Sequence, residues 1–301
     1  MMLADADPGV RQPLKAVLQQ NGFRDIIDAA NTGVVEEALI RNAVDLVVGD
    51  FSLPGADLCH LIHRARHHTV GNNPFVLTIV MTGHPTTEKV RRVVDSGADD
   101  LVIKPISPEQ VVQRISNLAR GRKPFVVTHD YIGPDRRKEI RPGVDSAPIV
   151  EVPNPLRAKA LSTQDAASIQ RMIDAAASRI NECKMERYAI QVKYLVDRIM
   201  PWYETPAETK DLLAYLDRLR FVGEDLSRRM RGTPYAHVSE LTLSLVELVN
   251  RMLLDPVNPD PKDLELLPKL CQAIGRAFDR GQQTVQAAQE ISRSLQAYTK
   301  R

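Results

Sequence analysis

The sequence predicts an α/β domain followed by an all-helical domain. In the first 120 residues, short runs of branched apolar side chains alternate with segments whose apolar residues recur every three to four positions. From about residue 161 onward, the helical spacing continues with few such runs. The chain has 301 residues, and ordinary domains hold roughly 100 to 200, so the length also indicates two domains.

Each element of the first domain has its own local signal. Five strand-like runs are expected at residues 2–4, 25–29, 45–49, 75–81 and 100–103. Helices are expected between and after them, starting near Pro8, which a first helical turn tolerates, and then at 36–41, 57–66, 87–96 and 108–120. Five βα units in series predict a parallel sheet with helices on both faces.

Four or five long amphipathic helices are expected after residue 161, and such helices form a bundle. Ser162 can cap the first helix, which should end before Pro201 because proline interrupts helices. The remaining helices are expected to begin at Thr205, to cover residues 238–254, and to run from Pro261 to the end with an interruption at Leu267-Pro268.

Composition excludes several classes of protein. The net charge of +2 comes from nearly balanced acids and bases, which argues against a generally cationic nucleic-acid binder. The three cysteines are far apart without CxxC spacing, so neither a disulfide framework nor a zinc site is indicated. No apolar run reaches the roughly 18 residues that a membrane span needs. A cytoplasmic protein without a membrane partner is expected.

Chemically competent residues follow four of the strand-like runs. Asp5, Asp50, Thr82 and Lys104 would meet because the carboxyl ends of parallel strands open on one edge of the sheet. Clustered carboxylates bind a hard cation such as Mg²⁺. An ammonium and a hydroxyl would bind the oxygens of a phosphoryl group that arrives on one carboxylate. The pattern therefore predicts a site for forming an acyl phosphate on aspartate.

Residues 1 to about 120 resemble the receiver domain of two-component response regulators. The resemblance rests on Asp5-Ala6-Asp7-Pro8, Asp50 with Leu53-Pro54-Gly55, Met81-Thr82-Gly83, Ser96-Gly97-Ala98-Asp99-Asp100 and Lys104-Pro105, in this order. It implies a flavodoxin-like fold with strand order 2-1-3-4-5 in a bacterial, cytoplasmic phosphoprotein. It also implies a cis peptide bond before Pro105.

The resemblance assigns roles to the residues at the sheet edge. Asp50 would accept the phosphoryl group, Thr82 would donate a hydrogen bond to it, and Lys104 would pair with it. Asp5, Asp50 and the backbone carbonyl of Ser52 would hold Mg²⁺. Asp7 is a doubtful ligand because successive side chains of an extended segment point to opposite sides.

Two residues depart from the family pattern. Ala6 stands where the family has an acidic metal ligand, so Mg²⁺ binding should be weak, since affinity depends on the number of carboxylates. Leu101 replaces the aromatic residue that the family uses as a switch, and it offers neither a hydroxyl nor a ring edge.

The resemblance implies a response regulator that a histidine kinase or a phosphotransfer protein phosphorylates on Asp50. The helical domain would then signal to an unidentified protein partner, and its long amphipathic helices also make a homodimer plausible. No enzymatic activity is expected beyond the receiver's own phosphoryl transfer and dephosphorylation. One alternative is a phosphorylation-independent pseudo-receiver that serves as a scaffold or dimerisation protein, and a minor alternative is a nucleic-acid-binding regulator.

Residues 121–160 are expected to form a basic, proline-rich linker between domains 1–120 and 161–301. Apolar residues between Phe125 and Ile132 would let it pack back on a domain. Its Gly133-Pro134-Asp135-Arg136-Arg137 element resembles one that follows receivers in some bacterial regulators, and its role is undefined. Arg137 and Arg141 have the spacing of a PilZ nucleotide site, but the Asp-x-Ser-x-x-Gly segment of that family is missing.

Other candidate sites are weaker. His63 and His67 are four residues apart on an expected helix and would suit a metal, but no acidic or cysteine partner adjoins them, so a solvated helix face is favoured. Cys183, His237, Glu240 and Glu247 are more consistent with core and surface positions than with an active site.

Overall fold

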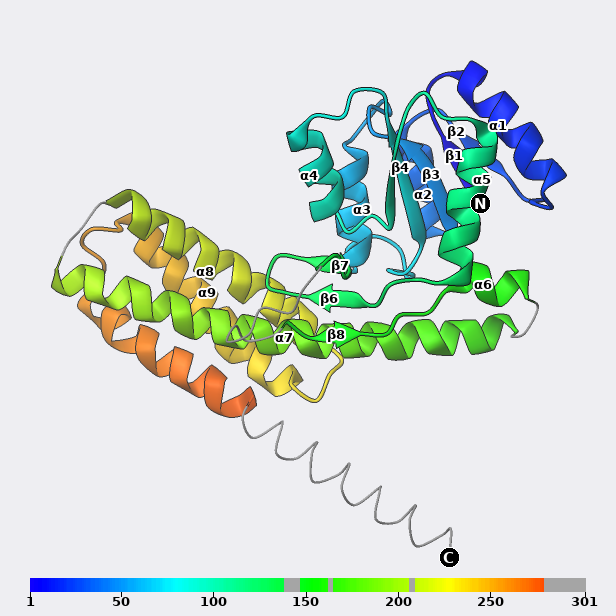
Figure 1. Cartoon of the computed structure of the whole chain (residues 1–301). Coiled ribbons are helices and arrows are strands. Elements are labelled where there is room, and N and C mark those ends of the chain that lie inside the picture. The colour runs from blue at the N-terminus through cyan, green and yellow to red at the C-terminus, as the bar shows by residue number, and fades with distance from the viewer. Residues whose placement is uncertain (138–146, 162–164, 206–208, 279–301) are drawn as a thin grey trace, which may run out of the picture. The chain divides into compact units, whose positions relative to one another are not determined.

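The computed structural model describes residues 1–137, 147–161, 165–205 and 209–278 (Figure 1). It contains two compact units, Met1–Ile180 and Asn181–Arg301. The division falls inside the long helix α7 (Ala166–Glu204) and not at residues 120 or 160. Each unit is described by itself.

The first unit is built on a parallel sheet with strand order β2-β1-β3-β4-β5, which confirms the predicted order. The strands are β1 (Met2–Ala4), β2 (Ile27–Ala29), β3 (Leu46–Asp50), β4 (Leu77–Thr82) and β5 (Asp100–Ile103). All residues of β4 are buried, as expected for a central parallel strand that helices cover on both faces.

Five helices surround this sheet, and each begins at a side chain that caps its first turn. They are α1 (Pro8–Gln20), α2 (Thr32–Ile40), α3 (Leu58–Arg66), α4 (Thr87–Asp95) and α5 (Pro108–Arg120). Their capping residues are Asp7, Asn31, Asp57, Thr86 and Ser107. Apolar residues of α2, α3 and α4 share one core with the sheet, and those of α1 and α5 share the other.

The segment expected as a linker contains short strands and a helix within the first unit. Strands β6 (Phe125–Val127), β7 (Ile132–Pro134) and β8 (Ile149–Val150) form an antiparallel sheet, and helix α6 (Pro155–Ala160) follows. Phe125 is fully buried, so the apolar residues of this segment do pack back on the unit. Arg141, the second arginine of the PilZ-like spacing, lies outside the described residues.

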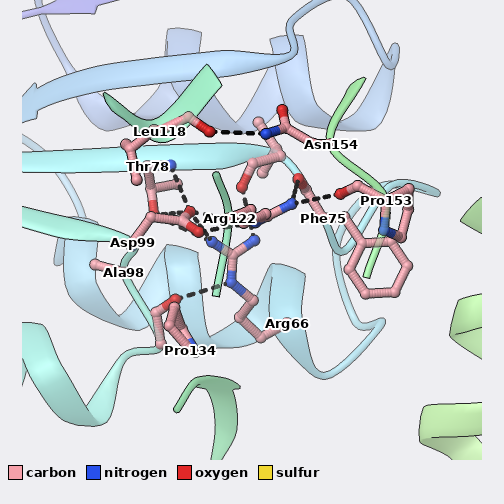
Figure 2. Close-up of polar contacts among 12 residues, drawn as sticks. Arg66, Phe75, Thr78, Ala98, Asp99, Leu118, Arg122, Pro134, Pro153 and Asn154 are labelled. Atoms are coloured by element: carbon pink, nitrogen blue, oxygen red, sulfur yellow. Dashed lines mark hydrogen bonds and ion pairs between the residues drawn. The ribbon is translucent and has the colours of Figure 1, made fainter. Parts of the chain in front are cut away.

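The segment from residue 121 to α6 is called the extension below. A buried carboxylate connects this extension to the parallel sheet. Asp99, directly before β5, accepts hydrogen bonds from Arg66 Nη2 at 2.9 Å and from Arg122 Nε at 2.9 Å (Figure 2). The backbone N–H of Thr78 on β4 donates to the same carboxylate at 2.9 Å. All three charged side chains are at most 2% exposed. One carboxylate therefore connects α3, β4, β5 and the start of the extension.

Main-chain carbonyls accept most of the further hydrogen bonds of the two arginines. Arg66 donates to the carbonyls of Gly97, Pro74 and Val76, and Arg122 donates to those of Phe75 and Pro153. Both guanidinium groups also lie over the ring of Phe125. The central guanidinium carbon of Arg66 is 5.3 Å from the ring centre, and that of Arg122 is 4.9 Å from it. Burial lowers the pKa of Arg66 to about 10 despite the nearby Asp99 charge, so the group remains charged near neutral pH.

The second unit is helical, as predicted. It contains α7 from Asn181 onward, α8 (Thr209–Met230), α9 (Ser239–Leu254) and a further helix at residues 261–278. Apolar residues from all four share one core, and Gly223 of α8 allows close approach to Val246 of α9. None of the described helices has an apolar stretch long enough to span a bilayer.

Two predicted helix interruptions are wrong. Helix α7 continues through Pro201 to Glu204, and residues 261–278 are helical through Pro268. Each proline removes one helical hydrogen bond, but buried neighbours such as Ile199 and Leu267 hold these turns against the core. The cap expected at Ser162, residues 206–208 of the helix expected to begin at Thr205, and residues 279–301 lie outside the described residues.

A partly buried carboxylate also holds α7 to α8. Asp225 accepts from Tyr188 Oη at 2.8 Å and from Arg229 Nε at 2.9 Å, and Arg228 is a further partner. Burial alone would raise the pKa of Asp225, but the charges and hydrogen bonds of Arg229 and Arg228 lower it to about 2. The carboxylate is therefore most stable in its ionised form in the folded protein.

We expect Asp99→Asn to lower the free energy of unfolding by about 3 kcal/mol or more, because two buried guanidinium groups lose their only shared carboxylate. Urea denaturation followed by circular dichroism measures the change. Asp100→Asn is the matched control, since Asp100 pairs with the half-exposed Arg114 at 3.4 Å, and it should cost less than about 1 kcal/mol. Equal losses in the two variants would contradict the stabilising role of the Asp99 contacts with Arg66 and Arg122.

The pKa of Asp225 predicts a pH dependence of stability. Because the folded pKa lies below the ordinary value of 3.8, ionised Asp225 stabilises the fold above pH 4, and this contribution disappears as pH falls toward 2. At pH 7, Asp225→Asn should lower the unfolding free energy by about 2 kcal/mol, and the difference should shrink below pH 4. Asp217→Asn, on the exposed side of α8, should show no such trend. A difference that does not vary with pH would refute this assignment.

Candidate functional site

The predicted site residues meet at the carboxyl edge of the parallel sheet. Asp50 ends β3 and Thr82 ends β4, while Asp5 and Lys104 directly follow β1 and β5. Parallel pairing aligns these ends, since Ala4 lies opposite Gly49 and Thr82 lies opposite Ile103. Main-chain hydrogen bonds extend the alignment, including one of 2.8 Å from the Lys104 N–H to the Thr82 carbonyl.

The ammonium group of Lys104 bridges the two carboxylates. Its Nζ lies 2.6 Å from Asp5 Oδ2 and 2.5 Å from Asp50 Oδ2. Burial lowers the pKa of Lys104, but the hydrogen bonds and charges of Asp5 and Asp50 outweigh burial and raise it overall. Lys104 is therefore a cation at all ordinary pH values.

Backbone donors hold the other oxygens of the two carboxylates. The N–H of Ser52 donates to Asp50 Oδ1 at 2.7 Å, and the N–H of Asp7 donates to Asp5 Oδ1 at 2.9 Å. Asp5 and Thr82 are buried, whereas Asp50 is half-buried. The arrangement leaves Asp50 as the more accessible carboxylate, and Thr82 follows Met81, the residue opposite Asp50 on β4. The Lys104-Pro105 bond is cis, as the resemblance implied.

The residues present do not fit a tightly bound Mg²⁺ ion. Ala6 has no oxygen donor, and the Asp7 carboxylate accepts from the Gly9 N–H at 2.7 Å as the cap of α1. Among the described residues, no three His, Cys, Asp or Glu side chains lie together in a metal-binding group. Since Mg²⁺ depends on oxygen ligands, only Asp5, Asp50 and the carbonyl of Ser52 remain as candidates.

Two side chains near this edge were not predicted. Arg11 Nη1 donates to the main-chain carbonyl of Asp5. The ring of Phe51, which directly follows Asp50, lies 5.5 and 5.3 Å from the cations of Lys89 and Arg92 on α4. No sequence signal distinguishes Arg11 from a solvated helix residue, because its contact is with a main-chain carbonyl.

The other sequence candidates do not form a second site. The rings of His63 and His67 stack with centres 4.0 Å apart, and His67 is buried, so the expected solvated face is wrong at that position. Leu101 is partly buried and packs on the core. Cys183 is buried, whereas His237, Glu240 and Glu247 are exposed.

Comparison with known proteins identifies the family of the first domain. Residues 1–116 match the family model of the response regulator receiver domain. The transcriptional regulatory protein AruR of Pseudomonas aeruginosa is 35% identical over 127 residues, which cover 40% of this chain and 49% of that protein. The phosphate regulon transcriptional regulatory protein PhoB of Escherichia coli is 26% identical over 127 residues, with 42% and 54% covered.

A cyclic di-GMP phosphodiesterase of Thermotoga maritima is 25% identical over 138 residues, with 46% of this chain and 36% of that protein covered. The chain thus spans about a third to a half of these relatives. Among solved structures, a CheY-like receiver domain protein from Methanospirillum hungatei is 22% identical, with a TM-score of 0.35 and coverage of 38% and 89%. The receiver domain of a putative response regulator NarL from Mycobacterium tuberculosis is 17% identical, with a TM-score of 0.36 and coverage of 40% and 95%.

We expect the charge of Lys104 to be coupled to that of Asp50. Lys104→Gln should destabilise the protein because Asp5 and Asp50 then repel each other without a shared cation. The loss should be smaller by about 1 kcal/mol in an Asp50→Asn background, as measured by a double-mutant cycle of urea denaturation. Lys159→Gln, whose ammonium pairs with Asp45, should show no coupling to Asp50→Asn. A cycle for Lys104 that closes to zero would argue against the bridge.

Proposed function

We propose that this chain, whose residues 1–116 form a response regulator receiver domain, accepts a phosphoryl group on Asp50 from a histidine kinase or a phosphotransfer protein. One observation carries the proposal: the half-buried carboxylate of Asp50 shares the Lys104 ammonium with the buried Asp5 at the edge where β3, β4 and β5 end. A nucleophile and a cation therefore meet at this edge of the sheet, where Thr82 ends the neighbouring strand β4.

The proposed step is a direct transfer. A carboxylate oxygen of Asp50 attacks the phosphorus of a phosphohistidine, a P–O bond forms, and the P–N bond breaks. The imidazole leaves with the electron pair of that bond and takes up a proton, and an acyl phosphate remains on Asp50. Lys104 offsets the negative charge on the phosphoryl oxygens, and the Thr82 hydroxyl donates a hydrogen bond to one of them.

Water can reverse this modification by attacking the same phosphorus, so the receiver's own dephosphorylation completes the cycle. We assign no further enzymatic activity to the chain. A receiver of this kind acts in the cytoplasm, where two-component kinases present their phosphohistidine.

We assign the output of the signal to the helical second unit, which would contact a protein partner. A homodimer of this chain is one form of that contact. AruR and PhoB are named as transcriptional regulators, but each aligns with under half of this chain. The near balance of acidic and basic residues along the chain does not favour a nucleic-acid surface.

A second candidate function has its own supporting observation. Ala6 lacks the acidic side chain of a metal ligand, and Asp7 is engaged as a helix cap. A pseudo-receiver that never carries phosphate, and that serves as a scaffold, would tolerate this loss. The two functions make opposite predictions for Asp50.

Intact-mass spectrometry after incubation with phosphoramidate separates them. Wild type should gain one phosphoryl group, and Asp50→Asn should gain none. Thr82→Ala should be labelled at least about tenfold more slowly, because it loses a hydrogen bond to a charged group. Asp45→Asn, at the opposite end of β3, is the control and should be labelled like wild type. Wild type that stays unlabelled by small donors and by a panel of histidine kinases would contradict phosphorylation of Asp50 and favour the pseudo-receiver.

A further inference from the structure

The Gly133–Arg137 element of the extension packs against the loop between α4 and β5, residues 96–99. The backbones of Gly133 and Gly97 lie so close that a Cβ on Gly133 would be 2.7 Å from the Gly97 Cα. Arg136 Nη2 donates to the main-chain carbonyl of Ala98 at 2.5 Å. Because only glycine permits so close an approach of two backbones, the element fits this loop in particular.

Other contacts hold the same loop to the extension and to α3. The Gly97 carbonyl accepts from Arg66 Nε at 3.0 Å, and the Asp99 carboxylate binds both Arg66 and Arg122. The extension thus contributes Arg122 and Arg136 to the contacts that fix the loop. A displacement of the loop has to weaken contacts with the extension.

Helix α4 connects this loop to the proposed acceptor site. The helix is capped by Thr86, four residues after Thr82, and it ends at Asp95, directly before the loop. Val93 is the one buried residue of α4, whereas α3, which has the same length, buries six. Since few buried contacts anchor α4, it can shift at a lower cost than α3.

The start of α4 is also linked to the strand that carries the acceptor. Phe51 directly follows Asp50, and its ring lies under the cations of Lys89 and Arg92 in the first turns of the helix. In the proposed function, Thr82 donates a hydrogen bond to the phosphoryl group. A change at Asp50 therefore acts on α4 through the segment that leads into it and through Phe51.

We infer that the Gly133–Arg137 element is an intramolecular docking element for the loop at residues 96–99, and that phosphorylation of Asp50 weakens this docking. The coupling rests on the proposed function, since it requires a phosphoryl group on Asp50. That group shifts the start of α4, and the loosely anchored helix transmits the shift to the loop. Because the two glycine backbones fit closely, a small shift is enough to loosen the contact.

Hydrogen–deuterium exchange measures this docking. Full-length protein is incubated with phosphoramidate and MgCl₂, intact mass confirms labelling, and peptides that span residues 96–99 and 125–136 are followed. Their exchange should be at least about fivefold faster in the labelled protein, which is the lower end of typical coupling between two sites. Asp50→Asn, treated in the same way, should show no change.

Two arginines of the element provide matched variants. Arg136→Gln removes the hydrogen bond to the Ala98 carbonyl, whereas Arg137→Gln removes an ion pair with Asp135 inside the element. Without labelling, Arg136→Gln should already exchange like labelled wild type, and labelling should change its rate by less than about twofold. Arg137→Gln should respond to labelling like wild type. Thermal melts show whether the variants are folded, and labelled against unlabelled wild type decides the question if Arg136→Gln is not.

The outcomes separate the docking from the function on which it rests. Labelled wild type that exchanges at the unlabelled rate, or more slowly, would overturn the inference and leave the proposed function standing. Arg137→Gln that matches Arg136→Gln would also overturn it, because the loss would then not depend on the contact with the loop. Wild type that cannot be labelled would remove the proposed function and the coupling together.

Discussion

The arrangement of the first unit depends on one ammonium group between two carboxylates. Pairing of β1 with β3 brings Asp5 and Asp50 to the same edge of the sheet, where their like charges repel. Lys104 reaches both carboxylates from the end of β5. Its positive charge therefore offsets the repulsion between Asp5 and Asp50. The same three groups, with Thr82, make Asp50 a chemically reasonable phosphoryl acceptor. Structural stability and proposed chemistry therefore share one interaction.

Much of this unit could be predicted because its signals are local. Alternation of buried runs with helical spacing located the five strands, and strand-end residues located Asp5, Asp50, Thr82 and Lys104. Arg11 was missed because an arginine in a helix usually indicates a solvated face, and only its contact with the Asp5 carbonyl distinguishes it.

The extension after residue 120 could not be predicted in the same way. Its short strands lack periodicity, and their stability comes from a contact between distant residues. Asp99 holds Arg66 and Arg122, which are far apart in sequence, and Phe125 packs against both guanidinium groups. From sequence alone, charged residues such as these are expected to lie on the protein surface. The continuous helices at Pro201 and Pro268 have a similar cause, because burial in a shared core outweighs the local preference of proline.

The central claim is that Asp50 carries an acyl phosphate. The most direct measurement treats phosphodonor-labelled protein with borohydride, which reduces an aspartyl phosphate to homoserine, and then maps the product by tandem mass spectrometry. The account predicts homoserine at position 50, dependent on the donor and absent at Asp5, Asp7 and Asp57. Homoserine at another aspartate, or none at all after donor treatment, would contradict it.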